Sequence, residues 1–202
     1  QRQMCIRDRY KSILEKGEVI LKGWNKALIY RKIAHLYVTL GEHESAVSML
    51  SEGRRFIVAG EESLETGLFY NSYALAQLKL GNFSESLGYC EWAEGLLKRF
   101  GDGSPRLRRE SINNSLIQGG IYFHQGWHPQ SMDILERLID EARELEFDSA
   151  VAMAQNFLGL IYIEKGDFET GQRLFEASRQ IFQERMDDVS LQEVNISISQ
   201  KL

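Results

Sequence analysis

Proline and cysteine are both scarce in this chain, at two residues each among 202. A proline inside a helix costs about 3 kcal/mol, so its scarcity leaves long stretches free to be helical. Cys5 and Cys90 stand far apart and look like reduced thiols, which argues against a disulfide framework. A chain of this length can bury enough surface to fold without covalent staples. The composition therefore favours an all-α protein.

Positive charge is also in short supply, since the formal net charge is −5 at pH 7. Nucleic acids and anionic membranes bind proteins mainly through positive charge, so neither is an expected direct partner. Long apolar runs are missing as well. The longest, residues 157–163, is far too short to span a bilayer. We therefore expect a cytoplasmic protein without a nucleic-acid or membrane partner.

Motifs for catalysis or metal binding are missing too. The sequence has no glycine-rich phosphate loop with lysine, no serine elbow and no pair of metal-binding histidines on one helix. His124 and His128 are four positions apart, a spacing that would let both bind zinc on an unbroken helix. Gly126 and Pro129 interrupt that helix, so a structural role for both histidines is favoured. We expect no enzyme activity, no cofactor and no metal.

What the chain does contain is a regular series of glycines. They recur at intervals of 40, 45 and 40 residues, at Gly41, Gly81, Gly126 and Gly166. Such a period indicates a helical-repeat architecture, in which each glycine ends a helix in a left-handed turn. Seven positions before each glycine stands a small residue that lets a second helix approach closely: Ala34, Ala74, Gly119 and Gly159. Four positions before it stand Tyr37, Tyr122 and Tyr162, with Gln77 in the second unit.

A second helix is predicted after each of these turns. Two residues beyond the glycine comes a ring, at His43, Phe83, His128 and Phe168. Another small position follows at Ala46, Ser86, Ser131 and Gly171, and an apolar one four residues later at Leu50, Cys90, Leu135 and Phe175. Because these offsets fall on one face of a helix, that face is predicted to be buried. We expect Cys90 to behave as a small buried hydrophobe with an unreactive thiol.

Helix-capping residues fall in the same frame. Asn82 with Glu85 forms a candidate capping box, and Asp167 is placed to cap the corresponding helix of the last unit. Ser104 and Pro105 place a cap before a proline at the first helical position. Residues 153–163 are apolar nearly all round, which predicts a helix packed against neighbours on both sides.

These units resemble the tetratricopeptide repeat. The clearest is AQNFLGLIY at residues 154–162, followed by GDF at 166–168, and the resemblance covers about residues 10–187. It implies a right-handed superhelical solenoid of antiparallel helix pairs, with about four repeats and partial repeats at both ends. The expected repeats are 25–59, 63–100, 104–145 and 148–186, flanked by a half repeat at 10–22 and a partial one at 189–202. Residues 1–9 resemble translated adapter sequence, so we expect a non-native or disordered tail there.

The period near forty, together with ALIYRKIA at residues 27–34, is similar to the repeat arrays of large bacterial signalling proteins. These arrays accompany ATPase modules, nucleotide cyclases or kinases. In the family, the first helices line a concave groove that binds an extended peptide or a partner helix. Carried over to this chain, the groove would present Arg31, His35, Asn71, Leu75, Lys79, Leu116, Phe123, His124, Asn156 and Leu160.

The resemblance implies a protein-interaction or scaffolding module that is not an enzyme, with a protein or peptide as partner. One alternative is the helical arm of a multidomain enzyme whose catalytic domain lies elsewhere. Another is self-association of the repeats.

Two further groups have open interpretations. Arg106, Arg108 and Arg109 crowd a helix N-terminus, where they oppose the helix dipole. Ion pairing with Glu110 and acidic neighbours is favoured there over an anionic partner. The tryptophans are candidate partner anchors, but for Trp92 and Trp127 packing in the core or at seams between repeats is favoured.

Overall fold

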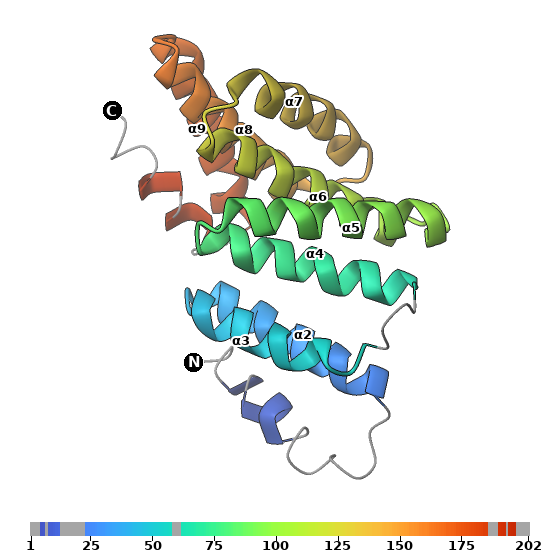
Figure 1. Ribbon diagram of the computed structural model, residues 1–202. Coiled ribbons are helices and arrows are strands. Elements are labelled where there is room, and N and C mark those ends of the chain that lie inside the picture. Colours follow the sequence, from blue (N-terminus) through green and yellow to red (C-terminus); the bar gives the residue numbers. More distant parts are fainter. Residues whose placement is uncertain are drawn as a thin grey trace. The chain divides into compact units, whose positions relative to one another are not determined.

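The computed structural model describes residues 5–6, 8–12, 23–57, 62–185, 190–192 and 194–196. Within these ranges the regular structure is entirely helical, so the predicted all-α class is confirmed. The main helices are α2 (Gly23–Thr39), α3 (His43–Arg54), α4 (Leu64–Lys79), α5 (Phe83–Phe100), α6 (Pro105–His124), α7 (His128–Glu144), α8 (Asp148–Glu164) and α9 (Phe168–Glu184) (Figure 1). No helix among the described residues is long and apolar enough to cross a membrane.

Consecutive helices form hairpins, and each hairpin turns at one of the four predicted glycines. Their φ angles are +77°, +79°, +75° and +83° in chain order, in the left-handed region that favours glycine. In each turn the N–H after the glycine donates to the carbonyl five residues earlier, at 2.9, 3.0, 2.8 and 2.9 Å. These are the bonds of a Schellman motif, which satisfies a carbonyl left free at the helix end. The predicted phase of the repeats is therefore confirmed.

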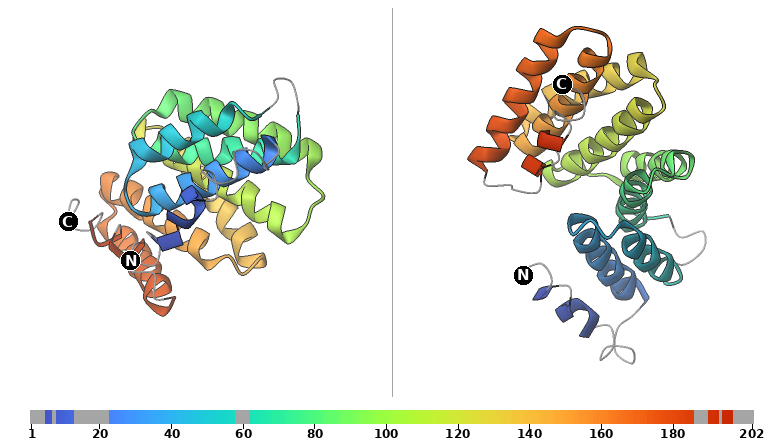
Figure 2. Two further views of the ribbon diagram at one scale, coloured as in Figure 1. Left: turned by 90° about the horizontal axis from the view of Figure 1, so that it is seen from below. Right: turned by 90° about the vertical axis from the view of Figure 1, so that its left-hand side faces the viewer.

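The chain divides into two compact units, residues 1–102 and 103–202. In the first unit α2 pairs with α3 and α4 with α5, and α4 also contacts both α2 and α3 (Figures 1 and 2). In the second, α6 pairs with α7 and α8 with α9, and α8 also contacts α6 and α7. Helix α8 therefore packs against three others, and eleven of its residues are buried, as its apolar circumference predicted. The assignment of residues 10–202 to one solenoid, with its repeat boundaries, stays a prediction.

The small residues of each hairpin lie where its two helices cross. Ala34 and Ala74 are buried on the first helices of their pairs. The Ser86 hydroxyl donates to the carbonyl of Ala74 at 2.7 Å, and the Ser131 hydroxyl donates to that of Gly119 at 2.8 Å. A small residue on one helix therefore exposes a carbonyl that the serine of the other helix reaches.

The last hairpin has glycine on both sides of this crossing. A Cβ added at Gly159 would lie 2.9 Å from the Phe175 ring and 3.2 Å from the carbonyl oxygen of Gly171. A Cβ added at Gly171 would lie 2.6 Å from Ile163 and 3.0 Å from the carbonyl oxygen of Gly159. The close approach of α8 and α9 therefore needs glycine at both positions.

The predicted caps are only partly found. The carboxylate of Asp167 accepts the Thr170 N–H at 3.1 Å, which confirms it as the N-cap of α9. The capping box at Asn82 is wrong, because its amide donates instead to the Gln77 side chain at 2.8 Å. Pro105 begins α6 as predicted, but the Ser104 side chain makes no cap bond. Ser63, which was not predicted, caps α4 by accepting the Thr66 N–H at 3.2 Å.

The packing of two tryptophans in the core or at seams between repeats is only partly found. Trp92 is 58% exposed and Trp127 is 49% exposed. Each indole does contact a tyrosine, Tyr70 at 5.0 Å and Tyr122 at 5.6 Å between ring centroids. One face of each ring therefore packs and the rest faces solvent.

The described residues near the two ends are helical. Residues 5–6 and 8–12 have helical backbone, and Tyr10 packs against the core of the first unit. The non-native or disordered tail expected over residues 1–9 stays a prediction, and residues 1–4 and 7 lie outside the described residues. Residues 13–22 of the predicted half repeat also lie outside them. Near the other end, Val194 is buried against Ala152 and Phe182.

Candidate functional site

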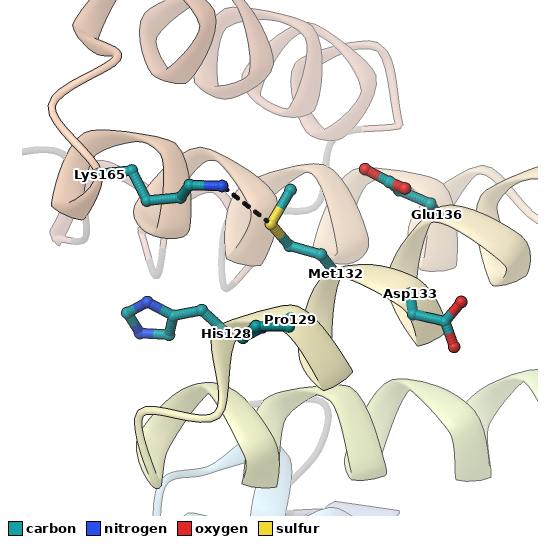
Figure 3. Close-up of a pocket in the computed structure, with 6 residues that line it drawn as sticks. All are labelled: His128, Pro129, Met132, Asp133, Glu136 and Lys165. Carbon is teal, nitrogen blue, oxygen red and sulfur yellow. Dashed lines mark hydrogen bonds between the residues drawn. The ribbon is translucent and has the colours of Figure 1, made fainter.

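A pocket of about 510 Å³ opens beside the first two turns of α7 in the second unit. Its floor and walls come from α7 and from the residue that follows α8. The lining residues are His128, Pro129, Met132, Asp133, Glu136 and Lys165 (Figure 3). Apart from proline and methionine, every lining side chain carries or can acquire a charge, so the pocket suits a ligand with polar ends and an apolar middle.

His128 closes one end of this pocket and connects two hairpins. Its ring stacks on Phe123 of α6, with centroids 6.0 Å apart and an 18° angle between the planes. Its Nε2 lies 3.1 Å from a carboxylate oxygen of Glu164, the last residue of α8. The contact is an ion pair whenever the imidazole is protonated. The histidine therefore holds the start of α7 against the end of α8.

An aromatic edge continues from His128 along the second unit. The ring of Phe123 lies 5.7 Å from that of Phe157 on α8 and 5.1 Å from that of His124. The rings of His124 and Phe157 meet edge to face at 6.3 Å. Phe123 and Phe157 are half-buried and His124 is exposed. The edge therefore offers partly covered ring surface that an apolar side chain could cover further.

The charged groups of the pocket differ in whether they already form an ion pair. Asp133 is engaged by Arg137, whose guanidinium donates to its carboxylate at 2.6 Å. Within the described part of the chain, neither Lys165 nor Glu136 forms an ion pair. The Lys165 ammonium instead lies 3.9 Å from the Met132 sulfur, a weak contact that Figure 3 shows across the pocket mouth. One cation and one anion are therefore left for a ligand.

The predicted groove residues are distributed over four helices in the two units. Arg31 and His35 lie on α2 and Asn71, Leu75 and Lys79 on α4, all in the first unit, while Leu116, Phe123 and His124 lie on α6 and Asn156 and Leu160 on α8 in the second. Asn71 and Asn156 are 4% exposed and Leu160 is 7% exposed, so they have little surface to offer. The other seven are half-buried or exposed. The groove as a binding surface stays a prediction.

The structure brings part of this set together with residues that the sequence did not single out. Phe123 and Leu160 share one apolar cluster, and His124 touches Phe157. Phe157, Met132 and Lys165 were missed as site residues. The available signal was positional: Lys165 directly precedes a turn glycine, where two of the other units have leucine.

Two of the three arginines at the start of α6 are occupied by contacts within their own unit. The Arg108 guanidinium pairs with Glu144 at the end of α7 at 2.9 Å. Arg109 donates to the carbonyl of Leu145 at 2.8 Å and lies over the Phe147 ring at 5.2 Å. Ion pairing, the favoured interpretation, is confirmed for Arg108 with Glu144 as its partner. Arg108 and Arg109 therefore connect the start of α6 to the end of α7.

The hairpins, their Schellman turns and their small-residue crossings define an all-α helical-repeat fold of the tetratricopeptide-like class. Among solved structures, that of RapI in its apo form is similar, with a TM-score of 0.60 and 14% sequence identity over 96% of this chain. The match covers 55% of the RapI chain, so this chain spans about half the length of that structure. No family model matches, and no curated protein matches. At this identity the likeness shows the fold.

Proposed function

We propose that the chain is a non-catalytic protein-interaction module that docks a peptide segment at the pocket beside α7. The observation that carries this proposal is that Lys165 and Glu136, which form no ion pair with any described residue, lie around the thioether of Met132. An extended peptide could place an acidic side chain at Lys165 and an apolar side chain against Met132. The neighbouring aromatic edge would receive a second apolar side chain.

The resemblance to long-period repeat arrays supports a regulatory role within a larger bacterial signalling protein. In that setting His124, an exposed member of the predicted groove in the same unit, would extend the peptide path. The alternative of a helical arm in a multidomain enzyme draws on the match to about half of a longer chain. A complete open reading frame with no catalytic or DNA-binding domain would remove that alternative and favour a free-standing adaptor.

A random peptide library displayed on phage tests the proposal on the full chain. We expect selected peptides to share an acidic residue next to an apolar one. Lys165→Glu should weaken their binding at least tenfold, because it replaces the attraction between the ammonium and the acidic side chain of the peptide with a repulsion between two carboxylates. Arg106→Glu is the matched control, since Arg106 is exposed and makes no ion pair among the described residues. Equal binding by parent and Lys165→Glu, with the helical signal unchanged, would refute the proposal.

A further inference from the structure

The outer face of α5 carries a large apolar side chain at a position that is not buried in any of the four hairpins. Trp92 stands eleven residues after its turn glycine, where the other hairpins have Glu52, Arg137 and Ala177. Glu52 and Ala177 are half-buried, and Arg137 is exposed. The exposure of Trp92 therefore follows from its place in the repeat. The fold makes no demand for an indole there.

The indole of Trp92 packs on a series of aromatic rings from α4 and α5. Its indole lies 5.0 Å from the ring of Tyr70 on α4, which stacks on Tyr89 at 5.7 Å. Tyr89 stacks in turn on Tyr73 at 4.3 Å, and the Tyr73 hydroxyl is 2.6 Å from that of Ser51 on α3. Tyr70 and Tyr73 are buried. The exposed indole is therefore preorganised, so that a partner loses little conformational entropy in ordering it.

One flank of Trp92 is open. Gly88 and Gly95 lie one turn before and one turn after it on the outer side of α5. A Cβ added at either glycine would meet nothing within 4 Å, so neither is needed for packing. Glycine weakens a helix interior relative to alanine. Beside a fixed indole, the two glycines let the backbone of a partner approach α5 closely.

The cations of α5 are already paired. Lys98 contacts the carboxylate of Glu94 at 2.5 Å, and Arg99 pairs with Glu62 before α4. Glu85 and Glu91 are exposed and form no ion pair among the described residues. The charge left uncompensated along α5 is therefore negative.

The two flanks of Trp92 differ in charge. Glu91 borders it on the glycine side, and Glu85 lies two turns before it on the same face. On the other side, burial raises the pKa of the Tyr89 hydroxyl, and the charge of Arg54 on α3 partly opposes that rise. The positive charge of Arg54 therefore acts on the Tyr89 side. The glycine flank is the acidic one.

We propose that this surface, defined as Glu85, Gly88, Glu91, Trp92 and Gly95, docks a cationic helix of a protein partner. An arginine or lysine of that helix would lie over the indole face, which attracts cations more strongly than other aromatic rings. Further basic residues would pair with Glu85 and Glu91. From Glu85 to Gly95 the helix rises by about 15 Å, which matches roughly three turns of the partner. A second copy of this chain is disfavoured, because crossing α5 on α5 would bring like charges together.

Binding of a designed peptide to the full chain tests this proposal. The probe is a fluorescein-labelled 18-residue amphipathic helix with arginine and leucine on one face, and its counterpart carries glutamate in place of arginine. Fluorescence anisotropy should show binding of the basic peptide that weakens with added salt, and none of the acidic one. Trp92→Ala should weaken binding at least tenfold, while Trp127→Ala, which removes a comparably exposed indole stacked on a tyrosine, should change it less than twofold.

Two further variants separate docking from folding and from general charge attraction. Gly95→Leu fills the open flank without a clash and favours the helix, so it should weaken peptide binding while the circular dichroism is kept. Arg54→Glu should not weaken it. Failure of the parent to bind the basic peptide, equal losses in Trp92→Ala and Trp127→Ala, or a dimer in sedimentation that Trp92→Ala abolishes would each overturn the proposal.

Discussion

Gly159→Ala probes the crossing of α8 and α9. The new methyl would lie 2.9 Å from the Phe175 ring and 3.2 Å from the Gly171 carbonyl oxygen. Phe175 is buried and the carbonyl belongs to α9, so relief requires α8 and α9 to move apart. Overpacking of this kind costs about 1–3 kcal/mol, and alanine recovers about 0.5–1 kcal/mol of helix propensity. Gly159→Ala is therefore expected to lower the free energy of unfolding by about 1–2 kcal/mol.

Gly88→Ala is the matched control, because it makes the same chemical change inside a helix where the methyl meets nothing within 4 Å. It should stabilise the chain by about 0.5–1 kcal/mol. Urea unfolding followed by circular dichroism should therefore separate the two variants by roughly 2 kcal/mol, and Gly159→Leu should lie further below Gly159→Ala. If Gly88→Ala stabilises and Gly159→Ala does too, the phase of the α8–α9 crossing is wrong.

Three further predictions concern single groups. Burial raises the pKa of the Cys90 thiol to about 12, so alkylation at pH 8 should be on the order of a thousandfold slower than for an ordinary thiol. Mass spectrometry should find Cys5 labelled first, and equal rates would contradict the burial. The backbone bond from Thr170 lowers the pKa of Asp167, so its contribution to stability is complete above the unfolded pKa and is lost as pH falls through the folded one, below about pH 4. Asp167→Asn should therefore flatten the acid limb of the unfolding curve, and an unchanged limb would refute the linkage. Ser63→Ala should cost about 1 kcal/mol in urea unfolding by removing the α4 cap, whereas no loss would show the cap to be dispensable.

The sequence predicted the hairpins because their determinants are local. A left-handed glycine and the small residues around it are spaced within one hairpin, so one pattern fixes the turn, the crossing and the burial of Cys90. The failed cap at Asn82 has a local reason too. The equivalent position is Trp127 in another hairpin, with φ and ψ within a few degrees of those of Asn82. The Schellman bonds set this geometry, so the turn does not require a capping side chain.

The candidate site could not be predicted in the same way, because its contacts join different hairpins. His128 meets Glu164 only when α7 packs on α8, and a pattern within one repeat contains no such pairing. The buried state of Asn156 has the same cause, since α8 is enclosed by three helices. From its residue type, Asn156 was predicted to expose a polar side chain to a partner. In the structure it is buried by the neighbouring helices.

Packing constrains the side chain at some positions of the repeat and not at others. Nine residues after each turn glycine the side chain is buried in every hairpin, at Leu50, Cys90, Leu135 and Phe175. Two residues further on, packing imposes nothing, and the position holds glutamate, tryptophan, arginine or alanine. A charged or small side chain there needs no further cause, whereas an indole that is 58% exposed lowers solubility and gains only its contact with Tyr70. The fold therefore does not require the indole of Trp92, and the proposed partner would give its exposure a physical reason.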